Sequence, residues 1–223
     1  MRRTGVANIK IGPFSGISHT LFLVAPPTQL EFDLLSHADA VPPRVVASRV
    51  LQRHRLRNDV LRRAQYVRRY FPELDGETIT VGLTRAASGM AIPGGTRIWL
   101  NPSRLSYHTI AHELMHLLQC RDIGIPAGER ACDVFSLARH WTLNDERPSY
   151  IRVPVSMLDG KGRLADPQAR VVFEVAREAV VQRSHGMRRY LSFFEAELAR
   201  RCERGYFNRT ILLAPAAGMP SRR

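Results

Sequence analysis

Two histidines four residues apart constrain this chain more than any other feature. The segment 108–119 reads HTIAHELMHLLQ, in which His112, Glu113 and His116 form an H-E-x-x-H pattern. Residues four apart on a helix project from one face, so both imidazoles can reach a single zinc ion. Glu113 lies about 100° further around the helix. It can therefore hold a zinc-bound water and take its proton rather than bind the metal itself.

The surrounding residues predict that this pattern lies on an amphipathic helix. We expect the helix over residues 107–120, with Gly124 and Pro126 marking its stop. Its apolar face would lie in the core and its histidines would face a cleft, as a metal site requires. The alternative is a surface helix whose histidines are only solvent-exposed polar residues. This alternative does not explain why a glutamate follows His112 at the position that the motif requires. The apolar face holds Ile110, Ala111, Leu114, Leu117 and Leu118, and the opposite stripe holds His108, His112, His116 and Gln119.

A catalytic zinc ion usually has three protein ligands and one open position, so a third ligand is expected further along the chain. The next predicted helix runs from about Glu129 to Trp141, and its polar stripe faces either water or the first helix. His108 and His116 cannot share one ion, because eight residues span about 12 Å along a helix. We therefore give His108 a supporting role. The polar stripe of the second helix holds Glu129, Asp133, Ser136 and His140.

An H-E-x-x-H motif followed by a helix with E-x-x-x-D, here Glu129 to Asp133, resembles the gluzincin branch of the zincin metallopeptidases. The resemblance implies that Glu129 is the third zinc ligand. It implies that Asp133 orients a ligand histidine, His112, through its free ring nitrogen. It also implies a compact, single-domain type of zincin, in which the strand 97–101 resembles the edge strand that pairs with the substrate backbone. The resemblance covers roughly residues 78 to 141.

Other assignments within the site stay open. Asp133 itself is an alternative third ligand, with Glu129 outside the site. Asp122 falls where a metzincin-type motif places its ligand, although Gln119 replaces the glycine of that motif. No motif marks the tyrosine or histidine that stabilises the oxyanion in this family, and Tyr150 and His140 are the candidates.

The rest of the pattern predicts a zincin-like α+β fold with a small mixed or antiparallel sheet. Alternating residues predict strands at Thr78–Leu83 and Thr96–Leu100. Helical periodicity predicts a backing helix over Arg44–Tyr70, ahead of the active-site helix and the glutamate helix. Tyr150–Met157 is a strand or an extended loop. A long helical stretch, Pro167–Glu203, is expected to break near Gly186.

We expect three parts along the chain. Residues 1–43 form an N-terminal extension, in which Leu21–Val24 is a candidate strand, and residues 44–158 form the catalytic core. Residues 159–223 form a C-terminal helical extension packed on that core. Three cysteines in 223 residues give no disulfide framework, and the longest apolar runs are too short to span a membrane. We therefore expect a cytoplasmic protein with no membrane partner.

The sequence thus predicts a zinc metallopeptidase, a hydrolase that cleaves peptide or protein substrates with Glu113 as general base. The formal net charge of +13 motivates an alternative, a nucleic-acid-associated protein. Such a protein would resemble the SprT-like proteases that act on DNA-bound proteins, or would be a non-enzymatic basic binding protein. The densest basic cluster, Arg53–Arg69, can equally be the solvated side of a helix. A purely structural zinc site would have no use for the glutamate.

Overall fold

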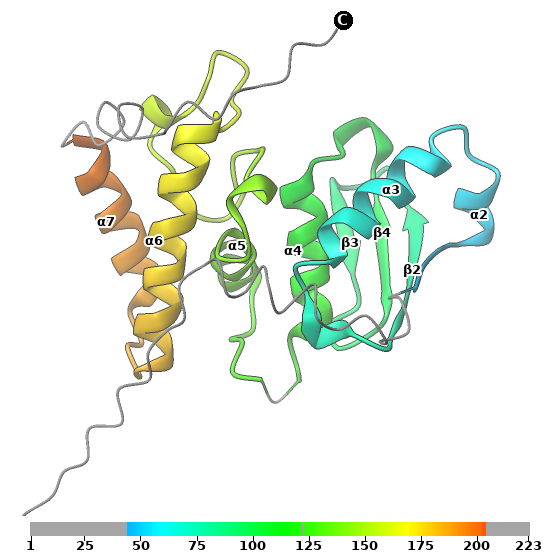
Figure 1. Ribbon diagram of the computed structural model, residues 1–223, viewed down its shortest axis with the longest axis horizontal. Helices are drawn as coiled ribbons and strands as arrows, with labels where there is room; N and C mark the ends of the chain where they lie inside the picture. Colours follow the sequence, from blue (N-terminus) through cyan, green and yellow to red (C-terminus); the bar gives the residue numbers. More distant parts are fainter. Residues whose placement is uncertain (1–43, 122, 204–223) are drawn as a thin grey trace, which may run out of the picture. The chain divides into compact units, whose positions relative to one another are not determined.

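The four strands in the described part of the chain form one mixed sheet in the order β1-β2-β4-β3. The computed structural model describes residues 44–121 and 123–203, which contain this sheet and six α-helices (Figure 1). The predicted strand Leu21–Val24, the rest of 1–43 and Asp122 lie outside the described residues. The strands are β1 (Arg44–Ala47), β2 (Thr78–Leu83), β3 (Gly89–Ala91) and β4 (Arg97–Leu100). The helices are α2 (Arg49–Gln52), α3 (Arg57–Arg68), α4 (Tyr107–Leu118), α5 (Glu129–Leu137), α6 (Asp166–Ser184) and α7 (Tyr190–Glu203).

The sheet is parallel except at one edge. β1 pairs with β2 and β2 pairs with β4 in parallel, whereas β3 runs antiparallel to β4. Gly89 lies opposite Leu100 and Met90 lies opposite Trp99. The fold is therefore α+β with a small mixed sheet, in agreement with the coarse expectation from the sequence.

Strand alternation gives the sheet two different faces. The side chains of the inner face are buried beneath α3 and α4, which pack against the sheet (Figure 1). Successive strand residues point to opposite faces, so the residues between them point away from these helices. The inner face holds Val45, Ile79, Val81, Ile98 and Leu100. The outer face holds Arg44, Val46, Thr78, Thr80, Gly82, Met90, Arg97 and Trp99.

The prediction that strand 97–101 forms the sheet edge is wrong. β4 occupies 97–100 but lies between β2 and β3, and the edge strand is β3. β4 pairs with β2 on one side and with β3 on the other. β3 is only three residues long and reads Gly-Met-Ala, which carries little strand signal. The sequence alone therefore missed the strand that borders the site.

The predicted helix over 44–70 is wrong in its first part. Residues 44–47 form β1 rather than a helix, because Val45 is buried on the inner face beside Ile79. Ser48 then begins the short α2, accepting a hydrogen bond from the backbone N–H of Leu51 at 3.3 Å. The long helix in this region, α3, spans only 57–68.

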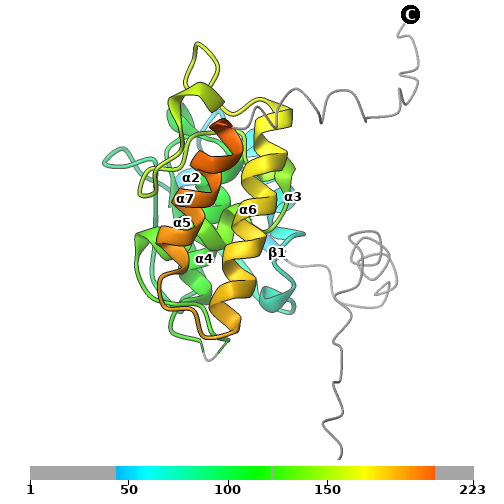
Figure 2. The same cartoon turned by 90° about the vertical axis from the view of Figure 1, so that its left-hand side faces the viewer.

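A second apolar core joins the C-terminal helices to α5. The predicted break is confirmed, since α6 ends at Ser184 and Gly186 has a φ of 92° before α7 begins. α6 and α7 lie side by side, with α5 packed against both (Figures 1 and 2). Val134 and Leu137 of α5 belong to this core. One side of α5 therefore packs against α6 and α7, and its other side faces α4.

The segment that follows α5 is irregular and contains two 3-10 helices, Trp141–Leu143 and Val155–Met157. The predicted strand or loop at 150–157 is a loop that ends in a 3-10 turn at Val155–Met157.

Within residues 44–121 and 123–203, no helix combines the length and the apolar character needed to cross a membrane.

Candidate metal centre

Helix α4 is held at its N-terminus by two polar groups. The hydroxyl of Ser106 accepts the backbone N–H of Thr109 at 2.9 Å, as an N-cap does. The carboxylate of Asp145 accepts the backbone N–H groups of Tyr107 and His108, each at 3.0 Å. A carboxylate at this end also complements the helix dipole. The start of the motif helix is therefore firmly positioned.

The motif helix is more deeply buried than its two-sided pattern predicts. His108, His112 and Glu113 are only 4%, 7% and 5% exposed. The reason is that α5 packs along the polar stripe of α4, so this stripe does not face open solvent. Buried polar groups need partners, and α5 supplies them to His112 through Asp133 and Glu129.

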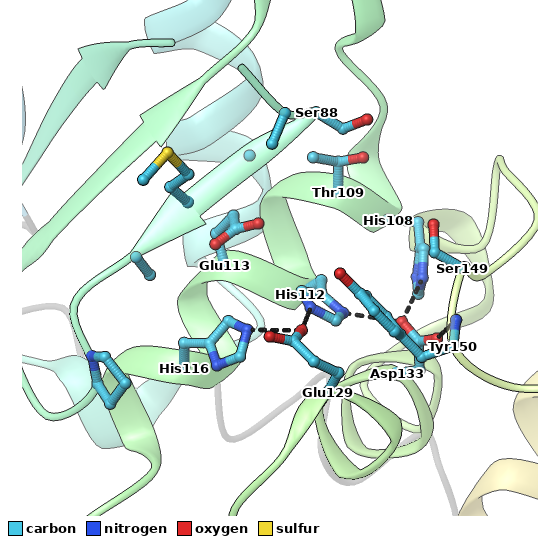
Figure 3. A pocket seen from close by; sticks show the side chains of 15 residues that line it. Ser88, His108, Thr109, His112, Glu113, His116, Glu129, Asp133, Ser149 and Tyr150 are labelled. Atoms are coloured by element: carbon cyan, nitrogen blue, oxygen red, sulfur yellow. Dashed lines mark hydrogen bonds and ion pairs between the residues drawn. The ribbon is translucent and has the colours of Figure 1, made fainter. Parts of the chain in front are cut away.

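Two ring nitrogens of α4 converge on one carboxylate oxygen of α5 (Figure 3). Nε2 of His112 lies 2.9 Å and Nε2 of His116 lies 3.1 Å from Oε2 of Glu129. Ligand atoms around a tetrahedral zinc ion, at bond lengths of about 2.1 Å, are roughly 3.4 Å apart. Both distances to Oε2 of Glu129 are thus close to the spacing between ligand atoms that a zinc ion requires.

Asp133 fixes the ring of His112. Its Oδ1 lies 2.8 Å from Nδ1 of His112, which directs the other ring nitrogen, Nε2, toward Glu129. Its Oδ2 accepts the backbone N–H of Tyr150 at 2.7 Å. Burial would raise the pKa of the Asp133 carboxyl, but the contacts with His108 and His112 hold the pKa well below its usual range. The ionised carboxylate is the orienting partner that a ligand histidine needs.

Gln119 performs the corresponding task for His116. Its Oε1 lies 2.9 Å from Nδ1 of His116, and its Nε2 donates to the carbonyl oxygens of Pro126 and Gly128 at 2.8 and 3.1 Å. Gly128 has a φ of 102°, which glycine adopts readily, and the next residue is Glu129. One side chain therefore ties a ring at the end of α4 to the turn that begins α5. No pattern in the sequence indicated this role of Gln119.

We expect Gln119→Leu to weaken zinc binding by about 10- to 100-fold, the usual effect of removing a group that orients a metal ligand. Leucine keeps the volume but cannot accept from His116 or donate to the turn before Glu129. Competition with a zinc chelator of known affinity measures the change. Gln182→Leu on α6 is the control and should leave the affinity unchanged. An unaltered affinity in Gln119→Leu would show that the ring of His116 needs no such support.

Two other sets of side chains bring metal-binding atoms together: His112, His116 and Cys132, and His108, His112 and Asp133. In the first, the Cys132 sulfur lies 3.3 Å from Nδ1 of His116, the nitrogen that Gln119 already occupies. Burial also raises the pKa of the Cys132 thiol far above its usual range. In the second set, Asp133 is engaged by Nδ1 of His112 and by a backbone N–H. Both sets would bind a metal through Nδ1 of a histidine, which Asp133 contacts in His112 and Gln119 contacts in His116. Glu129 instead faces the Nε2 atoms of these two rings.

Glu113 and His108 are the described residues lining the site whose buried polar atoms lack a hydrogen-bond partner. Oε2 of Glu113 is buried and has no hydrogen-bond partner among the described residues. Burial raises the pKa of Glu113 to about 7, the charge of Glu129 acts in the same direction, and His112 opposes both. A buried polar atom without a partner is costly, and such atoms are characteristic of functional sites.

Gly89 of β3 leaves room for Glu113. A Cβ atom at position 89 would lie 2.5 Å from Oε1 and 2.6 Å from Cγ of Glu113. The register places Gly89 and Ala91 on the inner face of the edge strand, beside α4. Both are small, so the carboxylate can lie against the strand. Neither the residue nor its strand was predicted from the sequence, because glycine gives no signal of such a close approach.

We expect Gly89→Ala to destabilise the fold by about 1–3 kcal/mol, as overpacking does, and to reduce activity by displacing the Glu113 carboxylate. Gly160→Ala is the matched control, because no atom lies within 4 Å of the position that its Cβ would occupy. Urea denaturation and peptide hydrolysis measure the two effects. Equal stability and activity in both variants would contradict the close packing of Gly89 on Glu113.

The candidate ligands border a cavity of about 320 Å³ between β3 and the loop at Tyr150 (Figure 3). The ring of Tyr150 stacks on His112, with centroids 5.6 Å apart, and lines this cavity. His108 lines it as well, and its Nε2 lies 3.4 Å from Oδ1 of Asp133, in ion-pair range but not in a well-aligned hydrogen bond. His140 does not reach the cavity: its ring stacks on Tyr70 instead. Of the two oxyanion candidates, the structure brings only Tyr150 to the site.

A scan of protein-family models found no match to this chain, and searches of curated proteins and of solved structures found none either. The interpretation of the site therefore rests on its own geometry.

Proposed function

We propose that this protein is a zinc-dependent metallopeptidase of the gluzincin type, with a zincin-like core. The observation that carries the proposal is the convergence of His112 Nε2, His116 Nε2 and Glu129 Oε2, beside a buried and unpartnered Glu113. Two imidazoles and one carboxylate form a donor set typical of catalytic zinc. Because Glu113 points into the same cavity, the site has the base that a structural zinc site lacks.

His112, His116 and Glu129 would hold the zinc ion. When bound, zinc supplies a Lewis acid that polarises a carbonyl group and makes water more acidic. Glu113 takes a proton from the attacking water and passes it to the amine that leaves. In the metal-free protein, burial raises the pKa of this carboxyl to about 7.

The cavity also offers contacts for an extended peptide. β3 lies at the end of the sheet, and its residues 89–91 line the cavity, so a substrate backbone can pair with the edge of β3 that no described strand occupies. On the opposite side, burial raises the pKa of the Tyr150 hydroxyl, which keeps it protonated. Tyr150 is therefore a hydrogen-bond donor for the carbonyl oxygen as this oxygen gains negative charge.

Zinc content and hydrolysis of an unfolded protein substrate test the proposal together. We expect one zinc per chain in the wild type and a large loss in His116→Ala and Glu129→Gln. Cys132→Ala should keep its zinc, which separates the proposed ligand set from the one that includes the thiol. A full equivalent of zinc in His116→Ala, or no hydrolysis by zinc-loaded wild type, would refute the proposal.

A further inference from the structure

The outer face of the sheet lacks negative charge. Its eight residues, defined above, come from all four strands, and the described helices α3 and α4 cover only the opposite face. Arg44, Met90 and Arg97 are exposed and Trp99 is partly exposed. None of the four strands contains an aspartate or a glutamate. The face therefore combines positive charge with an aromatic ring.

Trp99 lies across the neighbouring strand. A Cβ atom at Gly82 would approach Cδ1 of Trp99 to 2.5 Å and Nε1 to 2.8 Å. The indole therefore covers Gly82, which is buried while the tryptophan remains partly exposed. Any larger residue at position 82 would lift the ring off the sheet. The indole thus packs on Gly82 with the Arg97 guanidinium over its ring, and the rest of the side chain is partly exposed on the outer face.

Two arginines flank this ring. The guanidinium carbon of Arg97 lies 5.9 Å from the centre of the Trp99 ring. Arg49, at the start of α2, lines a hollow of about 400 Å³ together with Arg97, Thr80 and Trp99. Within the described part of the chain, neither arginine forms an ion pair with a carboxylate. Both cations are thus available to an external anion.

We propose that the outer sheet face binds single-stranded nucleic acid, with a base stacked on Trp99 and phosphates held by Arg49 and Arg97. Proteins bind single-stranded nucleic acid by combining aromatic side chains with a positively charged surface. The bases stack on the aromatic rings, and the basic side chains contact the phosphate of each nucleotide. A duplex keeps its base faces inside its own stack and fits less well. The net charge of +13 favours the approach of any such polyanion.

The binding face and the peptidase cavity share the edge strand β3, because Met90 belongs to the outer face and also lines the cavity. Met90 points outward beside Trp99, whereas Gly89 and Ala91 point inward toward α4 and Glu113. Nucleic-acid binding at this face does not depend on the proposed hydrolysis, and either activity can fail without the other.

Fluorescence anisotropy with the full-length chain tests the proposal, using a labelled 15-nucleotide oligo-dT, the matching oligo-U and a 15-base-pair duplex. We expect Trp99→Ala to weaken both single strands by about 5- to 150-fold, and Trp99→Phe to retain most of the affinity. Removing both Arg49 and Arg97 as glutamines should reduce the slope of log K against log salt by about 1.4, at ~0.7 per phosphate contact. Thermal melting checks that each variant is folded.

The matched control is the double variant Arg188→Gln, Arg189→Gln in the exposed turn between α6 and α7. It removes the same charge from another part of the surface and should change the affinity far less. The proposal is overturned if wild type binds neither single strand, or if folded Trp99→Ala binds as wild type does. It is also overturned if the control double variant loses as much affinity, or if the duplex binds as tightly as the single strands.

Discussion

We expect Glu113→Gln to lower peptide hydrolysis by about 10²- to 10⁴-fold, the usual contribution of general acid–base catalysis. Glutamine has the same shape as glutamate, so it fits beside Gly89, where a Cβ atom would already approach Oε1 to 2.5 Å. Its amide cannot accept a proton from water. The three groups that converge on each other, His112, His116 and Glu129, are unchanged. Zinc content should therefore stay near one per chain while turnover falls.

Initial rates on a fluorogenic peptide, measured together with bound zinc, check this result. Glu178→Gln on α6 is the control, since Glu178 is an exposed partner of Arg201 far along the chain from the motif. It makes the same chemical change and should leave the rate unaltered. Should zinc-loaded Glu113→Gln retain more than a tenth of the wild-type rate, another group must accept the proton.

The helices that carry the candidate ligands could be predicted because their patterns are local. His112 and His116 are one helical turn apart, and so are Glu129 and Asp133. α4 and α5 form where expected, and the contact between Asp133 and His112 has the geometry that the resemblance implied. Short spacing on one helix fixes relative directions before any tertiary contact is known.

The supporting groups could not be predicted because they depend on contacts between distant segments. Gly89 matters only because β3 lies against α4, and its importance arises from the absence of a side chain. Gln119 was considered only as a replacement for a glycine, whereas its amide joins His116 to the turn before α5. His140 lies on the expected stripe, but α5 ends at Leu137 and the ring turns toward Tyr70.

One error in the sheet has a related cause. The apolar residues between 44 and 56 fit a helical stripe, yet Val45 pairs with Ile79 in a parallel ladder. Parallel pairing joins segments far apart in the sequence, so a local window cannot distinguish it from a helix. The edge position of strand 97–101 was implied by the resemblance rather than by a local pattern, and the observed strand order contradicts it. The sequence alone did not indicate a role for Trp99, because its position over Gly82 depends on the pairing of β4 with β2.

Stability of the metal-free protein should fall as the pH rises from about 4.5 to 7. Burial raises the pKa of Glu113 from 4.5 to about 7, so the folded chain keeps a proton that the unfolded chain has released. Below pH 4.5 both states are protonated and the carboxyl costs nothing. Above pH 7 both are ionised, and the folded state carries the full penalty of about 3 kcal/mol, at 1.36 kcal/mol for each pH unit.

Glutamine does not titrate, so the test compares how the free energy of unfolding depends on pH in wild type and in Glu113→Gln. Urea denaturation of zinc-free wild type and variant, from pH 4.5 to 8, should show the variant gaining relative stability with rising pH. Most of the gain should come before pH 7, and the difference should level off above it. A zinc ion held by the neighbouring ligands favours the ionised carboxylate, so it should reduce the slope in wild type. Parallel profiles for the metal-free proteins would mean that Glu113 is not buried as a proton-holding acid, and the site would lose its distinctive base.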